Sequence, residues 1–247
     1  MKWPARFLAL VLFGFSAPAP AAEGDPCRTV TSAGNEFSVC TLDLRRYRLK
    51  LFWREPGGEA YGSFDRLRRS RDGARVAVAM NAGMYHSDLS PVGLYVENGQ
   101  ELKRINTQNG PGNFHMKPNG VFYVSGREAG VLETGRYLRL KPKADFATQS
   151  GPMLVIDGQI HPKFSEAGIS RKIRNGVGIR DGRTVVFAIS NAPVTFGEFA
   201  HLFRDELGCA NALFLDGTIS SLYAPSLGRT GVSLLPLGPI VAAVPEP

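Results

Sequence analysis

Short runs of alternating apolar and polar residues constrain the fold of this chain more than any other feature. They recur along most of its length and read as β-strands: "SVCTLDL", "YRLKLFW", "VAVAM", "VGLYV", "GVFYV", "PMLVI", "GVGIR", "TVVFAIS" and "ALFL". Turn signals separate many of them: Gly57-Gly58, Asn98-Gly99, Asp157-Gly158 and Asp181-Gly182. The pattern predicts a strand-rich domain.

Two segments have the periodicity of helices. The shorter is "SFDRLRRS", residues 63–70, and the longer is "TFGEFAHLFRDELG", residues 195–208. Thr195 is a suitable N-cap with Glu198 three positions on, which makes a capping box, and Gly208 supplies a left-handed C-cap. The longer helix lies between two predicted strands, so we expect a crossover unit that leaves Asp216 at the C-terminal end of a strand. The sequence therefore predicts a single strand-rich α+β domain with a mixed sheet and few helices.

The N-terminal segment predicts export. Lys2 and Arg6 precede the apolar run 7–15, and small residues lead to Ala21 and Ala22, which is typical of a secretory signal peptide over residues 1–22. A membrane anchor is the alternative, but the apolar run is too short to span a bilayer. Residues 23–247 then form the domain, in the periplasm or outside the cell, and no later segment predicts a membrane span.

Charge and cysteines limit the partners and the chemistry. Removing Lys2 and Arg6 from 29 basic residues leaves 27 against 22 acidic ones, a net charge of +5. Such a charge favours acidic polymers or lipid headgroups outside the cytoplasm, and no basic-aromatic motif predicts nucleic-acid binding. Cys27, Cys40 and Cys209 predict one disulfide and one remaining thiol, with the pairing left open.

Several polar stretches are candidates for a functional site, although each alone also fits an ordinary turn or loop. "LDGTISS" carries Asp216, Gly217, Ser220 and Ser221 directly after an apolar strand, and "NAGMYHS" carries Asn81 and His86 in the same way. "NGPGNFHMKPNG" is a Gly- and Asn-rich loop with Lys117, a composition that can present backbone N–H groups to an anion. "SGP" holds Ser150 and Gly151, and "RNG" holds Arg174 and Asn175. Since no phosphate-loop, dinucleotide or zinc motif occurs, we expect no cofactor of those classes.

Taken in order, these stretches resemble the phosphodiester glycosidase family, the domain of the mannose-6-phosphate uncovering enzyme, and within it an exported bacterial subgroup. The family pattern of N-G-G-Y/F, S-G-P, R-T-A-I-G and L-D-G-G-G-S-S is matched here by "NAGMY", "SGP", "RNGVG" and "LDGTISS". The likeness extends over residues 37–244. Ala82, Thr218 and Ile219 replace family glycines, and we expect these bulkier residues to reshape the pocket.

The resemblance implies hydrolysis of a sugar, such as N-acetylglucosamine, from a sugar-1-phosphodiester or a phosphodiester-linked glycan. It implies catalytic roles for Asp216 as base or nucleophile, Arg174 as the group that holds the phosphodiester, and Asn81 as a ligand to a hydroxyl or phosphate. The remaining candidates would line the site: His86, Lys117, Ser150, Gly151, Asn175, Gly217, Ser220 and Ser221. A divalent cation such as Ca²⁺, held by Asp216, Asn81 and backbone carbonyls, is compatible with these oxygen ligands. The alternative function is a non-catalytic domain that binds envelope polysaccharide.

Overall fold

A computed structural model describes residues 24–164, 168–216, 218–231, 233 and 235–246. The predicted signal peptide lies outside these residues. The described part forms three sheets and few helices, so the strand-rich α+β prediction is confirmed. Every strand pairing in it is antiparallel, where the sequence predicted a mixed sheet.

The largest sheet has seven strands and carries most of the predicted runs. Its order across the sheet is β1 (Cys27–Ser32), β2 (Asn35–Asp43), β13 (Thr184–Ser190), β12 (Asn175–Ile179), β14 (Asn211–Asp216), β10 (Met153–Ile156) and β11 (Gln159–Ile160). Both β13 and β14 pair antiparallel with β12 between them, so they point the same way and the predicted crossover is confirmed.

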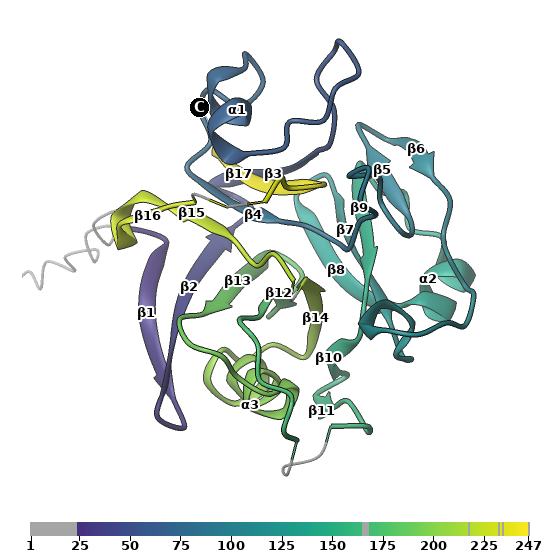
Figure 1. Cartoon of the computed structure of the whole chain (residues 1–247), viewed down its shortest axis with the longest axis vertical. Coiled ribbons are helices and arrows are strands. Elements are labelled where there is room, and N and C mark those ends of the chain that lie inside the picture. The colour runs from purple at the N-terminus through teal and green to yellow at the C-terminus, as the bar shows by residue number, and fades with distance from the viewer. Residues whose placement is uncertain (1–23, 165–167, 217, 232, 234, 247) are drawn as a thin grey trace, which may run out of the picture.

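Two five-stranded sheets complete the fold. One has the order β16 (Arg229–Thr230), β15 (Leu222–Ala224), β4 (Val78–Asn81), β17 (Ile240–Pro245) and β3 (Tyr47–Phe52). The other has the order β6 (Gln100–Lys103), β5 (Tyr95–Glu97), β9 (Phe146–Ser150), β7 (Gly120–Ser125) and β8 (Glu128–Glu133). Figure 1 shows the first of these above the large sheet and the second on the right of the molecule. The main core lies where the three sheets meet, because all three contribute to it: Leu42, Phe187, Leu213, Leu49, Met80, Val241, Tyr95 and Phe122.

The helices cover the outer faces of the sheets. α1 (Phe64–Arg69), α2 (Thr134–Leu140) and α3 (Phe196–His201) are short, and single turns occur at Asn113–His115, Leu202–Glu206 and Pro225–Leu227. α3 has the predicted capping box of Thr195 and Glu198, and Gly208 adopts the predicted positive φ of 62°. The segment between them is not a uniform α-helix, however, because Leu202–Glu206 forms a π-turn.

α3 and the following π-turn pack closely on the large sheet because the facing strand is rich in glycine. A Cβ at Gly178 would lie 2.6 Å from the Phe203 ring, and one at Gly176 would lie 3.2 Å from Phe199. The glycines of β12 therefore leave room for these two aromatic rings, and α3 lies beneath β12 and β14 in Figure 1.

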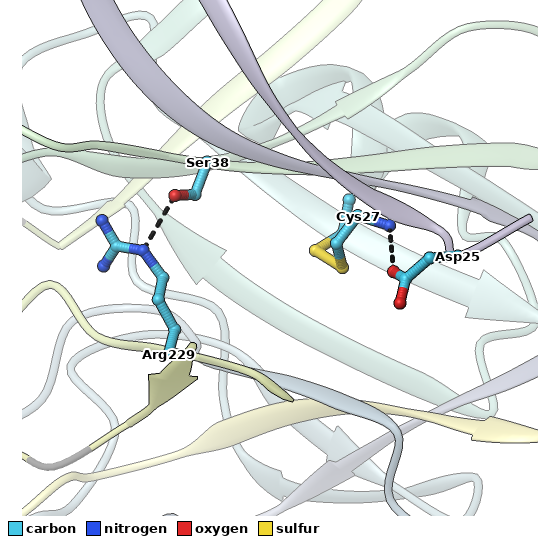
Figure 2. Close-up of a disulfide and its surroundings, with 5 residues drawn as sticks. Asp25, Cys27, Ser38 and Arg229 are labelled. Atoms are coloured by element: carbon cyan, nitrogen blue, oxygen red, sulfur yellow. Dashed lines mark hydrogen bonds between the residues drawn. A yellow bond between two sulfur atoms is a disulfide. The ribbon is translucent and has the colours of Figure 1, made fainter. Parts of the chain in front are cut away.

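The first hairpin holds the disulfide. Cys27 and Cys40 are directly opposed on β1 and β2 and are bonded, whereas Cys209 is a buried free thiol. Figure 2 shows the Asp25 carboxylate accepting a 2.8 Å hydrogen bond from the Cys27 N–H, and the Ser38 hydroxyl accepting one of 2.8 Å from Arg229 Nε. The disulfide pairing that the sequence left open is therefore Cys27 with Cys40.

No helix of the described residues is both long enough and apolar enough to cross a bilayer.

Candidate functional site

Asp216 lines a cavity of about 500 Å³. Three separate segments line it. The first includes residues 84–87 and Val92, the second supplies Gly112 and Asn113, and the third supplies Asp216, Thr218 and Ile219. These are parts of three of the stretches that the sequence singled out. Among the described residues that line the cavity, Asp216 is the one carboxylate and His86 the one imidazole.

A bulge at the end of β14 sets the position of Asp216. Asn175 is opposite Asp216, but Gly176 is opposite Phe214, so Leu215 is an extra residue on β14. The Ser150 hydroxyl donates a 2.7 Å hydrogen bond to the Leu215 carbonyl. Bulges re-aim side chains at strand ends, and this one leaves Asp216 at the cavity with 7% of its surface exposed.

Asn175 ties the Asp216 backbone to the neighbouring sheet. Its Oδ1 accepts a 2.9 Å hydrogen bond from the Asp216 N–H, while its Nδ2 donates to the Asn81 carbonyl at 3.0 Å and to Asn81 Oδ1 at 2.9 Å. Asn81 Oδ1 also accepts from the Ser221 N–H at 2.8 Å. Asn81 and Asn175 are fully buried, so they form a positioning network behind the cavity and do not contact solvent.

Asn81 retains an unused donor group. Its Nδ2 is buried and has no hydrogen-bond partner within the described part of the chain. An unsatisfied buried amide costs about 1–3 kcal/mol, so such a group is expected to meet a water or a ligand atom during function.

The serines and Gly151 support the same network. Ser220 Oγ donates to the Asp216 carbonyl at 2.6 Å, and the Asp216 Oδ1 accepts from the Thr218 N–H at 2.8 Å. Gly151 allows close packing, because a Cβ there would lie 2.7 Å from the carbonyl oxygen of Phe114. The sequence predicted that Ser150, Gly151, Ser220 and Ser221 contact substrate. None of the four is among the described residues that line the cavity, and the Ser150 and Ser220 hydroxyls instead bond to the backbone carbonyls of Leu215 and Asp216.

Arg174 lies on the opposite side of β12 from Asn175. Its guanidinium is 1% exposed, donates to the carbonyls of Val194 and Ser170 at 2.9 Å each, and lies 3.6 Å from the Phe196 ring centre and 5.4 Å from that of Phe214. Burial lowers the pKa of Arg174 to about 10, so it stays charged at neutral pH. It does not line the cavity, and its contacts favour a positioning role over the predicted direct contact with phosphate.

Two other residues predicted at the site, His86 and Lys117, lie in different parts of the structure. His86 is exposed and lines the cavity as expected. Lys117 instead holds the Gly- and Asn-rich loop, because its Nζ donates to the Thr107 carbonyl and to Asn109 Oδ1, each at 2.8 Å. Gly217 lies outside the described residues.

The site residues predicted from sequence did not include Tyr85 or Asn113, although both line the cavity. Thr218 and Ile219, which were expected to reshape the pocket, line it as well. Tyr85 packs against Gly238, where a Cβ would lie 2.3 Å from its ring, and its hydroxyl donates to the Pro236 carbonyl at 3.2 Å. Burial, together with the negative charge of Asp216, raises the pKa of Tyr85 to about 12. Tyr85 was within the quoted "NAGMY" motif, so the motif position was the signal for this residue.

One of the predicted Ca²⁺ ligands, the Asn81 amide oxygen, is already engaged in hydrogen bonds. Asn81 Oδ1 already accepts two hydrogen bonds, which occupy both of its lone pairs. Within the described ranges, no group of three or more His, Cys, Asp or Glu side chains is gathered in metal-binding proximity. Asp216 would therefore have to bind the cation without the Asn81 amide oxygen.

The site is thus a cavity with one carboxylate at the end of strand β14, built from sequence motifs that lie far apart. The phosphodiester glycosidase family model matches residues 74–231, which include all of these motifs, and the chain belongs to this family. Across 220 residues it is 38% identical to the uncharacterized protein YigE of Escherichia coli (strain K12), covering 88% of this chain and 84% of that protein.

Solved structures share the fold. The catalytic domain of zebrafish N-acetylglucosamine-1-phosphodiester alpha-N-acetylglucosaminidase, auto-inhibited by its pro-peptide, has a TM-score of 0.59 at 15% identity, covering 90% of this chain and 82% of that one. A hypothetical protein from Synechocystis has a TM-score of 0.56 at 16% identity, covering 89% of this chain and 61% of that one. At these identities the likeness extends to the fold alone.

Proposed function

We propose that this protein is an exported hydrolase that releases a sugar from a sugar-1-phosphodiester, with the Asp216 carboxylate acting at the anomeric carbon. The observation that carries the proposal is the convergence of distant family motifs on one cavity that contains Asp216. Asn81, Ser150 and Asn175 hold the backbone around this carboxylate through buried hydrogen bonds. Such support is what a reacting group needs to keep a fixed position.

The chemistry suits a cavity with one carboxylate. A phosphate monoester is a good leaving group with a second pKa of about 6, so its departure needs less general-acid assistance than that of an ordinary alcohol. Asp216 would activate water or attack the anomeric carbon directly, and both roles require the ionised form. His86 is exposed at the same cavity and would contact the phosphate.

Arg174 would act from the far side of β12. Its bonds to the Val194 and Ser170 carbonyls join the segments before β12 and before α3, next to the strand that carries Asn175. Loss of this contact would loosen Asn175 and, through it, the Asp216 backbone. We therefore expect Arg174→Lys to lower kcat, since a lysine lacks the planar guanidinium that covers the Phe196 ring.

The test is the release of reducing sugar from N-acetylglucosamine-1-phosphodiesters. Asp216→Asn should abolish turnover and leave the melting temperature nearly unchanged, because an asparagine Oδ1 can still accept the Thr218 N–H. The matched control is Asp65→Asn, which removes an exposed carboxylate from α1. Full turnover by Asp216→Asn would remove Asp216 from the mechanism. The export part of the proposal is tested by recovery of the chain, shortened near residue 22, from the periplasm or medium.

A second candidate is a non-catalytic domain that binds envelope polysaccharide. It is favoured by Thr218 and Ile219, which line the cavity where the family pattern has glycines. Retention of glycan by both the wild type and Asp216→Asn, with no turnover by either, would support this function over hydrolysis.

A further inference from the structure

The C-terminal end of α2 exposes leucines beside basic side chains. Leu138 is 39% exposed and Leu140 is 60% exposed, and both are among the few large apolar side chains on the described surface. Arg139, Lys141 and Lys143 lie between and after them, and all three are exposed. These five residues, Leu138, Arg139, Leu140, Lys141 and Lys143, are called the α2 surface below.

The fold holds this segment out from the domain. Thr134 is buried and donates to Asn119 Oδ1 at 2.8 Å, and the Tyr137 ring lies 5.9 Å from that of Tyr123, so one side of α2 is fixed to the sheet. Lys141 then adopts a left-handed conformation with φ of 45°, which ends the helix directly after Leu140. In Figure 1, α2 lies at the right-hand edge of the molecule, outside the sheet of β5 to β9.

The segment between Glu133 and Asp145 carries a net positive charge. Residues 134–144 contain four basic residues and no acidic one. Arg136 pairs with Asp157 at 3.2 Å. Arg139, Lys141 and Lys143 form no ion pair with any described residue. Three cations of the α2 surface are therefore available to an anionic partner.

The alternation of exposed leucines with these three cations fits one class of binding partner best. A soluble polyanion would satisfy the cations and leave both leucines in water. A membrane that contains acidic phospholipids offers negative headgroups at the level of the cations and an apolar layer just beneath for the leucines. We propose that the α2 surface binds the protein peripherally to an acidic phospholipid membrane. The segments that line the Asp216 cavity are different, so the proposal is independent of the hydrolase function.

Binding to vesicles tests the proposal. The exported protein is mixed with vesicles of phosphatidylglycerol and phosphatidylcholine in equal amounts, and with vesicles of phosphatidylcholine alone. Replacing Arg139, Lys141 and Lys143 together by Gln should weaken binding to the acidic vesicles roughly 100-fold, because each basic residue near such a surface contributes about fivefold. The matched control, Arg68→Gln with Arg69→Gln and Arg71→Gln, removes the same charge from the region of α1 and should weaken binding only a few-fold. Equal effects of the two triple variants would overturn the proposal.

A local probe separates lipid insertion from simple charge attraction and from any binding by the N-terminal segment. Leu140→Cys is labelled with an NBD fluorophore, since Cys209 is buried and 1% exposed. Its emission should rise on acidic vesicles, whereas the same label at Leu235→Cys, a leucine 55% exposed elsewhere, should not respond. Unchanged emission at residue 140 would overturn the proposal. The proposal would also be overturned if soluble polyphosphate competed fully for binding and the NBD emission at residue 140 did not rise on vesicles. That result would assign the cations to a soluble polyanion.

Discussion

Asn175→Ala should disrupt both the stability and the catalysis of this protein, because one side chain joins two sheets at the site. The substitution removes three hydrogen bonds of 3.0 Å or less, two to Asn81 and one from the Asp216 N–H. It also leaves the buried Asp216 N–H without this acceptor. At roughly 1 kcal/mol for each bond, the free energy of unfolding should fall by about 3 kcal/mol. This is less than the total stability of a typical domain, about 5–15 kcal/mol, so the variant should still fold.

The effect on catalysis follows from position and not from contact. Asn175 is fully buried and does not line the cavity, so its loss should displace Asp216 without removing a substrate contact. Displacement of a reacting group by about 1 Å costs roughly 100-fold in rate. We therefore expect kcat for release of reducing sugar to fall by about that factor, with a smaller change in KM.

Chemical denaturation and steady-state kinetics measure the two effects. The matched control is Asn211→Ala at the opposite end of β14, where Oδ1 accepts one 3.0 Å hydrogen bond from the Asp157 N–H. That variant should lose about 1 kcal/mol and keep full activity. The reasoning is refuted if Asn175→Ala unfolds at the denaturant concentration of the control, or if its kcat equals that of the wild type.

Cys27 and Cys40 are separated by 13 residues, and replacing both by Ser should lower the free energy of unfolding by about 3 kcal/mol in denaturant titrations. Reducing the disulfide in a Cys209→Ala variant should have the same effect. A melting curve that reduction leaves unchanged would contradict this prediction. Burial lowers the pKa of His161 to about 4, so the unfolded chain binds a proton first as the pH falls below 6.5. The free energy of unfolding should therefore fall by on the order of 3 kcal/mol between pH 6.5 and 4. His161→Phe, whose ring can still stack on Phe164, should not show this pH dependence when unfolding is measured across the same range. Finally, hydrolysis should persist in EDTA, since Asn81 Oδ1 is occupied by two donors; loss of turnover that Ca²⁺ restores would show that a cation binds at the site.

Local chemistry determined much of the fold in advance. The alternating runs became strands because their apolar faces needed cover, and Thr195, Glu198 and Gly208 marked the two ends of the α3 region. Strand β9 (Phe146–Ser150) was missed, since Thr148, Gln149 and Ser150 look like a polar loop in sequence. These side chains can be buried because groups from distant segments form hydrogen bonds with them. The partners are, in the same order, the Gly83 N–H, the Leu94 N–H and the Leu215 carbonyl.

The sequence by itself determined that Asp216 ends a strand and that distant motifs carry the polar groups of the site. Tertiary structure alone decided which of these groups meet: Asn175 bonds to Asn81 from 94 residues away, whereas Arg174, its neighbour in the chain, turns to Phe196 on the other face. The physical reason is that successive side chains of a strand point to opposite faces. Which face is covered by a helix and which opens toward a cavity depends on the elements packed against it, and no local pattern contains that information.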